Sequence, residues 1–152
     1  MAQESQGVVL YWSSSGSTTA STASANAIGS VTGFNGPGGS AAIIDVTHLG
    51  STAKEKMMGL PDEGQFSFDL LLDSADAVQT RLRADRVTRS LRKVVIKLND
   101  STDDKTKTKI LFDAYCTNFS ITGSVDDVIK ASVQLEITGP TSWTNSTVIP
   151  IP

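Results

Sequence analysis

Residues 129–138 read Ile-Lys-Ala-Ser-Val-Gln-Leu-Glu-Ile-Thr, and this stretch carries the clearest structural signal in the chain. Apolar and polar side chains alternate without a break, which is typical of a β-strand with one face in the core and the other in water. Gly139-Pro140 comes next, and we expect the strand to end there. The chain is therefore predicted to be built around a half-buried sheet.

Other segments carry the same signal or a weaker form of it: 27–33, 41–47, 66–73, 94–98 and 110–121. In the last of these the apolar positions change phase after Cys116, which predicts a β-bulge near Thr117 and Asn118. The first segment runs into Gly33-Phe34-Asn35-Gly36-Pro37-Gly38-Gly39, a cluster of turn residues. Asn99 to Asp104 is expected to form a hairpin turn.

One segment has helical rather than strand spacing. It begins after Ser74, a candidate N-cap, and its cations gather toward the C-terminal end, where the helix dipole favours them. The apolar positions at helical spacing are Val78, Leu82, Ala84, Val87 and Leu91. We expect a single helix here.

The predicted fold is mainly β: an antiparallel β-sandwich or partly open barrel with one flanking α-helix and extended N- and C-terminal arms. Residues 27–143 form the predicted domain, and 144–152 form a tail. Residues 1–26 are interpreted as an arm outside the core, with Val8–Trp12 as its only apolar element. Ser and Thr number 36 and are dense from Ser13 to Ser24, where no charge occurs.

Bulk composition excludes several classes of protein. The net charge of −3 disfavours gripping nucleic acid over the whole surface, because such binding depends on Lys and Arg. The single cysteine, Cys116, cannot form an intrachain disulfide. Neither a signal-peptide pattern nor an apolar run of about 18 residues is present, so a soluble protein made in the cytosol is expected.

The connection from His48 to Gly64 is long for a compact domain, in which about four to six residues are usual. It is predicted to be a polar loop, and it contains the exposed pair Met57 and Met58. Long loops of this kind are usually functional or disordered. The methionines favour a contact surface.

The sequence offers little support for a catalytic site. His48 with Asp45 and a serine could form a hydrolase triad, but no Gly-x-Ser-x-Gly elbow is present. One His and one Cys cannot make a zinc site, so no metal or cofactor is expected. The basic run from Arg81 to Lys93 lacks the aromatic residues usual in single-strand recognition. We expect it to pair instead with nearby acids, within the molecule or in a neighbouring copy, namely Glu55, Asp62, Glu63, Asp69 and Asp73.

A family resemblance rests mainly on two adjoining stretches. Residues 44–55 read Ile-Asp-Val-Thr-His-Leu-Gly-Ser-Thr-Ala-Lys-Glu, and residues 59–67 read Gly-Leu-Pro-Asp-Glu-Gly-Gln-Phe-Ser. Together they resemble the signature of tail tube proteins, the major tail proteins of long, non-contractile-tailed double-stranded DNA phages. Weaker matches follow at Gly123–Val128 and Thr138–Trp143. The resemblance covers about residues 27–143, and the N-terminal arm has no counterpart that we can match.

The resemblance implies a β-sandwich with one helix, whose copies form hexameric rings that stack into a tube for DNA. It implies a non-enzymatic virion protein in the phage tail, present in the host cytoplasm before assembly and not associated with a membrane. The expected partners are copies of the chain and other tail proteins, namely the tape measure, terminator and distal tail proteins. DNA would pass through the lumen without specific binding.

Three sets of residues are predicted to carry this function. The loop 48–64 is expected to contact the adjacent ring through Thr52, Lys54, Glu55, Lys56, Met57, Met58, Asp62 and Glu63. Acids on the polar faces of strands are candidates for the lumen wall, where they would repel phosphates: Asp45, Asp69, Asp113 and Glu136. Cations of the helix are candidates for subunit interfaces: Arg81, Arg83, Arg86 and Arg89.

Three other functions remain open on the sequence alone. A tail terminator, or the tube protein of a related bacterial injection system, would share the architecture. A soluble β-sandwich binding module with a Ser/Thr-rich linker, or a small hydrolase using His48, would belong to a different class.

Overall fold

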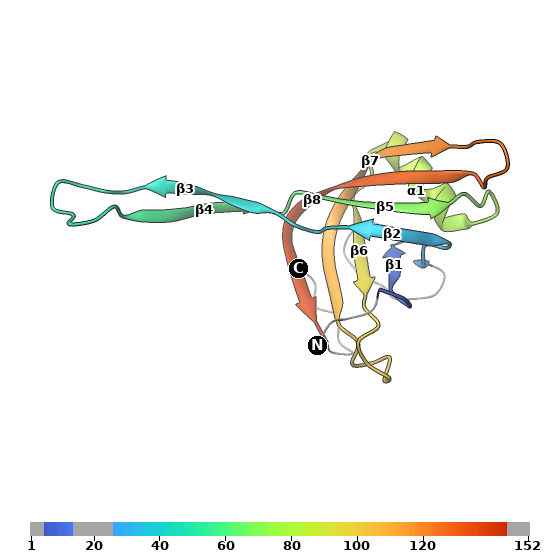
Figure 1. Ribbon diagram of the computed structural model, residues 1–152, viewed down its shortest axis with the longest axis horizontal. Helices are drawn as coiled ribbons and strands as arrows, with labels where there is room; N and C mark the ends of the chain where they lie inside the picture. The colour runs from blue at the N-terminus through green and yellow to red at the C-terminus, as the bar shows by residue number, and fades with distance from the viewer. Residues whose placement is uncertain (1–4, 14–25, 146–152) are drawn as a thin grey trace.

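The structure is a computed structural model that describes residues 5–13 and 26–145, and it consists of a curled sheet, one helix and a projecting two-stranded arm (Figure 1). Its elements are β1 (Val9–Trp12), β2 (Val31–Asn35), β3 (Ser40–Asp45), β4 (Lys56–Asp62), β5 (Gln65–Leu71), α1 (Ala77–Thr88), β6 (Arg92–Lys97), β7 (Lys109–Thr122) and β8 (Lys130–Thr144). The main sheet has the order β1-β6-β7-β8-β5-β2 with antiparallel neighbours. β3 and β4 form a separate sheet.

The long strands β7 and β8 curl the main sheet into a half-barrel. Their ladder shifts register between Cys116 and Asn118, which confirms the predicted bulge, and again between Leu111 and Asp113. β8 continues to Thr144, so the prediction that it ends at Gly139-Pro140 was wrong. Gly139 has a φ of 75°, and this left-handed conformation lets the strand bend and resume pairing.

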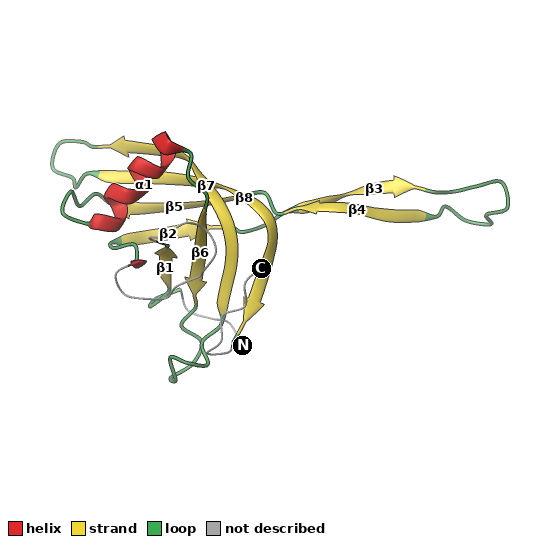
Figure 2. Ribbon diagram, turned by 180° about the vertical axis from the view of Figure 1, so that it is seen from behind, coloured by secondary structure: helices red, strands yellow, loops and turns green. Residues whose placement is uncertain are grey.

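One face of the sheet carries the main core, and α1 covers part of it by packing against β7 (Figure 2). A smaller buried cluster, Tyr11, Val95 and Leu111, lies on the other face. The alternating residues predicted to point inward on β5 and β8 are buried there: Phe66, Phe68, Leu70, Ala131, Val133, Leu135 and Ile137. Ile121 and Ile129, which were also predicted to point inward, are 53% and 52% exposed. They lie beside the turn of the β7–β8 hairpin, where no other described residue covers them.

The helix begins at Ala77, and its N-cap is Asp76 rather than the predicted Ser74. The Asp76 carboxylate accepts hydrogen bonds from the Val78 and Gln79 amides, at 2.8 and 3.4 Å, which satisfies the free N–H groups of the first turn. Val78 and Leu82 are buried as predicted. The prediction was wrong for two apolar positions that are exposed, Ala84 and Val87. Within the described ranges, no helix is long and apolar enough to cross a membrane.

The N-terminal strand belongs to the core, so the prediction that residues 1–26 are an arm outside it was wrong for β1. β1 pairs with β6 at the edge of the main sheet, and Leu10 and Trp12 are almost completely buried. The Trp12 indole N–H donates to the Asp85 carboxylate on α1 at 2.7 Å. Four consecutive large apolar residues, three of them of high β-propensity, thus outweigh the polar composition around them. Most of the Ser/Thr-rich run, residues 14–24, lies outside the described residues, as does the predicted tail after Asn145.

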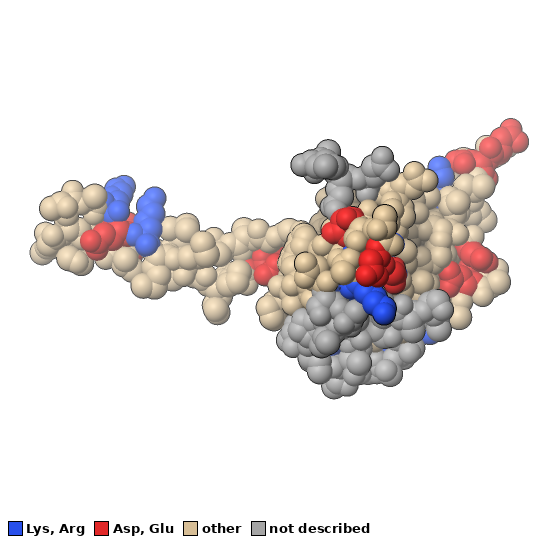
Figure 3. All heavy atoms as spheres, turned by 90° about the horizontal axis from the view of Figure 1, so that it is seen from below, with Lys and Arg blue, Asp and Glu red and all other residues tan. Residues whose placement is uncertain are grey.

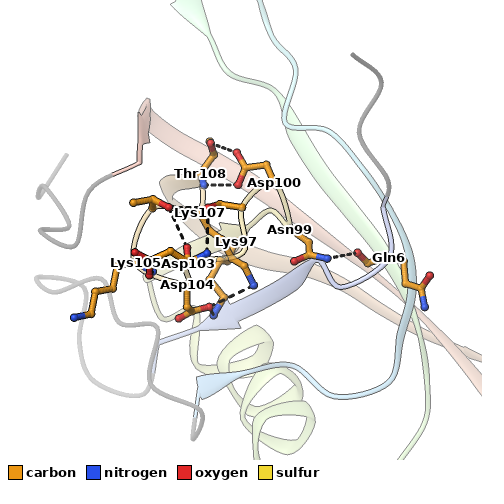
Figure 4. Close-up of polar contacts among 11 residues, drawn as sticks. Gln6, Lys97, Asn99, Asp100, Asp103, Asp104, Lys105, Lys107 and Thr108 are labelled. Atoms are coloured by element: carbon orange, nitrogen blue, oxygen red, sulfur yellow. Dashed lines mark hydrogen bonds and ion pairs between the residues drawn. The ribbon is translucent and has the colours of Figure 1, made fainter.

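A network of polar contacts stiffens the β6–β7 connection, which was predicted as a hairpin turn (Figure 4). Asp100 accepts hydrogen bonds from the backbone amide and the hydroxyl of Thr108, and Asp103 accepts one from the Lys105 amide. Asn99 donates to the Gln6 carbonyl oxygen at 3.2 Å, which ties the connection to the start of the chain. These bonds replace ladder pairing in a segment of Asp, Ser and Thr.

Asp104 lies between two lysines in this connection. Its carboxylate accepts a hydrogen bond from Lys97 Nζ at 2.9 Å, and Lys107 Nζ lies 3.5 Å away. The hydrogen bond and the charge of Lys97 lower the pKa of Asp104 below its ordinary value of 3.8. Since folding lowers this pKa, the contribution of Asp104 to stability is present above pH 3.8 and is lost as the pH falls through the folded value.

We therefore expect Asp104→Asn to lower the melting temperature slightly at pH 7, because exposed ion pairs contribute little. The difference from the wild-type protein should close as the pH falls below 3.8. Melting temperatures measured by circular dichroism across this range test the sign. A difference that grows toward acid would contradict it.

Candidate functional site

The β3–β4 arm projects from the main sheet as a long antiparallel hairpin (Figure 1). The prediction of a continuous loop over 48–64 was therefore wrong for Lys56–Asp62, which forms β4. Ile43 pairs with Met58 and Ile44 with Met57, so the aliphatic residues lie directly across from one another. Cross-strand aliphatic pairs explain why this polar segment forms a strand.

Polar contacts hold the outer turn of the arm, residues 46–55, in one shape. Thr47 is central: its hydroxyl accepts a hydrogen bond from the Glu55 amide at 2.9 Å, and its own amide donates to Asp45 at 2.9 Å. The hydrogen bonds from Thr47 lower the pKa of Asp45. Nδ1 of His48 accepts from the Gly50 amide at 3.1 Å, and Nε2 of the same ring lies 3.6 Å from the Glu55 carboxylate. The two ring nitrogens of His48 thus take part in bracing the turn.

The base of the arm is fastened to the main sheet by close backbone approaches. Gly38 and Gly64 form a parallel bridge, and a Cβ on Gly64, whose φ is 74°, would lie 2.5 Å from the Gly38 oxygen. The Ile137 amide donates to the Gly64 oxygen, and Thr141 donates to the carboxylate of Glu63 at 3.0 Å. Glycine is therefore required at Gly64, and the base of the arm is held against β8 at a defined place.

The arm exposes aliphatic side chains over most of its length. Its exposed aliphatic side chains come from both strands and the turn: Ile43, Ile44, Val46, Leu49, Met57, Met58 and Leu60. A two-stranded hairpin is at best marginally stable alone in water, and a contiguous exposed apolar patch marks an interaction site. This surface is the strongest candidate for a functional site in the described residues.

The predicted contact residues divide between the two ends of the arm. Thr52, Lys54 and Glu55 lie in the outer turn, and Met57 and Met58 lie on β4 next to Lys56. Asp62 and Glu63 lie at the base, where Asp62 accepts a hydrogen bond from the Gly64 amide. In the space-filling view, charged side chains gather toward the outer end of the arm (Figure 3). The structure thus brings the first six residues together and leaves the last two apart from them.

Three of the four predicted lumen acids share one face of the main sheet. Asp69, Asp113 and Glu136 each neighbour buried residues in sequence and therefore point away from the core. Lys93 donates to Asp113 at 2.8 Å and neutralises it. Asp45 is on the arm, away from this face. Hydroxyl and amide groups surround the acids on the same face, at Ser67, Ser120, Ser132 and Gln134.

The four predicted interface cations are all on α1 or at its end, but they differ in their contacts. Arg81 donates to the Trp12 carbonyl oxygen at 3.2 Å, and the Arg83 guanidinium lies 6.0 Å from the centre of the Phe119 ring. Both therefore brace the subunit. Arg86 and Arg89 are exposed.

Within the subunit, two cations of the basic run, Arg92 and Lys93, pair with acids other than the five predicted; pairing with a neighbouring copy stays a prediction. The carboxylate of Asp85, on α1 itself, accepts two hydrogen bonds from Arg92 at 3.0 Å. Lys93 is bound by Asp113, as described above. The sequence pattern missed both partners. Asp85 lies inside the basic run itself, and Asp113 is distant from it in the sequence.

A second exposed apolar patch went unnoticed in the sequence. It lies at the connection between β7 and β8 and consists of Ile121, Val125, Val128 and Ile129, which are all more than half exposed. The sequence signal that could have revealed this patch is a pair of valines in a polar segment: Val125 within the turn Gly123–Asp127 and Val128 directly after it. We call these four residues the far patch.

No group of three or more His, Cys, Asp or Glu side chains that could hold a metal ion occurs within residues 5–13 and 26–145. Cys116 is buried, and burial raises the pKa of its thiol to about 11. The thiol is therefore protonated at neutral pH and poorly placed to act as a nucleophile. What the described residues offer is contact surface.

Comparison with solved structures finds the same fold in tubes of several kinds. The SPP1 tail tube matches with a TM-score of 0.67 and 12% identity, over 95% of this chain and 80% of that chain. The tail of an empty GTA particle, refined with C6 symmetry, matches with a TM-score of 0.66 and 16% identity, over 94% and 99%. The sheath-tube complex of an extracellular contractile injection system, PVC, matches with a TM-score of 0.69 and 10% identity, over 95% and 92%.

No curated protein matches in sequence. A family model does: the one described as phage tail tube, lambda-like, matches residues 1–147. The match includes the N-terminal segment, so the interpretation that residues 1–26 have no counterpart in the family was wrong. With the fold and the exposed arm, this match establishes that the chain belongs to the lambda-like family of phage tail tube proteins.

Proposed function

We propose that copies of this chain assemble into hexameric rings, which stack into the hollow tube of a phage tail through which DNA passes. The observation that carries the proposal is the β3–β4 arm, whose aliphatic side chains pair across the hairpin but stay exposed in the described subunit. Burying apolar surface is the main driving force of association. The C6 symmetry of the similar GTA tail supports six subunits in a ring.

The polar sheet face supports a conduit that does not hold DNA. Binding to DNA gains free energy when Lys and Arg displace counterions from phosphates, and an acidic or neutral wall avoids this gain. Asp69 and Glu136 carry the negative charge on this face, since Lys93 neutralises Asp113 and Lys130, on the same face, pairs with Asp127. We propose that this face lines the lumen. Asp45 would then lie at a contact between subunits.

The protein in this proposal is structural and has no enzymatic activity. The contacts of His48 support this reading over a hydrolase, because its ring nitrogens lie against Gly50 and Glu55 within the arm. Its partners would be other copies and the tape measure, terminator and distal tail proteins. It would be made in the host cytoplasm and end in the tail of the virion.

Negative-stain electron microscopy of the purified full-length chain tests the proposal. We expect hollow rings or tubes, with sixfold symmetry in averaged end views. A different rotational symmetry would overturn the hexamer but leave the tube. A strict monomer in light scattering, at the highest concentration that can be reached, would overturn the tube as well.

A further inference from the structure

The β3–β4 arm is apolar on both of its faces. Side chains alternate between the two faces of a β-ribbon, so the pair Ile43 and Met58 lies on one face and the pair Ile44 and Met57 on the other. The first pair is 60% and 70% exposed, and the second is 48% and 57% exposed. An arm that lay flat on a single surface would bury one pair and leave the other in water. Two apolar faces therefore require cover from two sides.

The far patch lies at the opposite end of the long axis of the molecule from the arm (Figure 1). Ile121 and Ile129 flank the turn, and Val125, at its tip, is 92% exposed. The arm and the far patch are thus two different apolar surfaces that point in opposite directions. A contact between the arm of one copy and the far patch of another is therefore head-to-tail. When successive copies are related by translation along one axis, such contacts build an open, extending stack rather than a closed ring.

We propose that each arm inserts between two copies of the chain in the next ring, with its Ile43–Met58 face on one copy and its Ile44–Met57 face on the other. The far patches of those two copies receive it. This inference rests on the proposed function and adds to it the receiving surface and the number of subunits that each arm joins. An arm held between two subunits also ties them to each other, so stacking would stabilise the receiving ring.

Cross-linking from the two faces of the arm tests the inference. Met57→Cys, Met58→Cys and the double variant are labelled with a thiol-reactive benzophenone; the buried thiol of Cys116, with its pKa of about 11, stays unlabelled. Each labelled protein is then assembled as a small fraction in an excess of the wild-type chain, so that labelled subunits are isolated in the tube. After irradiation, the covalent products are separated on a denaturing gel.

We expect each single variant to give dimers and the double variant to give trimers, because its two labels reach two different copies. Mass spectrometry should place the cross-links in or beside residues 121–129. Tubes in which the double variant gives only dimers would overturn the inference while leaving the proposed function intact. Failure of the wild-type chain to form tubes would instead remove the proposed function, and the inference with it.

Charge substitutions provide a second test that needs no label. Met57→Asp and Met58→Asp place a carboxylate on opposite faces of an exposed hairpin, and each is expected to abolish stacking of rings. Val125→Asp should do the same from the receiving side, whereas the conservative Val125→Ile should assemble normally. Normal tubes from either methionine variant would show that one face is free and would overturn the inference. Normal tubes from Val125→Asp would exclude the far patch as the receiving surface.

Discussion

Removal of the β3–β4 arm is expected to abolish tube assembly while the subunit stays folded. In this variant a short Gly-Ser linker replaces residues 40–62 and joins two neighbouring segments, because Gly38 and Gly64 already form a bridge. None of the arm residues is buried, so the core loses nothing. The free energy of unfolding should change by about 1 kcal/mol or less, as is usual for exposed surface. Circular dichroism and urea unfolding measure the fold, and electron microscopy measures assembly.

The matched control keeps the length and apolar character of the arm. A variant with leucine at all four paired positions, Ile43, Ile44, Met57 and Met58, is expected to form tubes. Loss of assembly in this control would show that side-chain shape rather than apolar character decides the contact. Tubes of normal length from the variant without the arm would contradict the role of the arm altogether.

Trp12→Ala is expected to destabilise the subunit by about 3–5 kcal/mol, the usual cost of removing a large buried aromatic side chain. The side chain of Trp12, the last residue of β1, is fully buried in the core, and its indole N–H donates to Asp85 at 2.7 Å. The substitution leaves a cavity and removes one of the hydrogen bonds to a buried carboxylate. Urea unfolding, followed by the fluorescence of the remaining Trp143, measures the loss.

Trp143 provides the control, because the same residue type occurs there at 64% exposure. Trp143→Ala should change the free energy of unfolding by about 0.5 kcal/mol, as expected for an exposed site. Equal effects of the two substitutions would contradict the placement of β1 in the core. Such a result would return the N-terminal segment to the role of an arm outside the domain.

Local patterns predicted the strands of the sheet well where one face is buried. The alternation in residues 129–138 gave the correct face for Ala131, Val133, Leu135 and Ile137, and the phase change after Cys116 gave the bulge. Local patterns failed at the ends of elements. Ile121 and Ile129 keep the alternation of the strands, but whether an apolar residue is buried depends on what lies above it, which is information from distant parts of the chain.

The candidate site was predicted in position but not in form. Length and composition marked residues 48–64 as a contact segment, and the exposed methionines are indeed there. The hairpin escaped notice because Gly59 and Pro61 are residues that usually interrupt strands. Both residues nevertheless lie in β4, which pairs with β3 and places Ala41 opposite Pro61. A strand of a two-stranded hairpin has a free edge, so it can accept a proline that a central strand could not.

By itself, the sequence determined the β class, the single helix of the described residues, the bulge and the position of the exposed segment, because each depends on the spacing or composition of neighbouring residues. Only the tertiary structure showed that β1 completes the core, that Asp85 and Asp113 hold the cations, and that the arm and the far patch lie at opposite ends of the molecule. These features depend on contacts between residues far apart in the chain, and spacing along the chain carries no record of which distant segments meet.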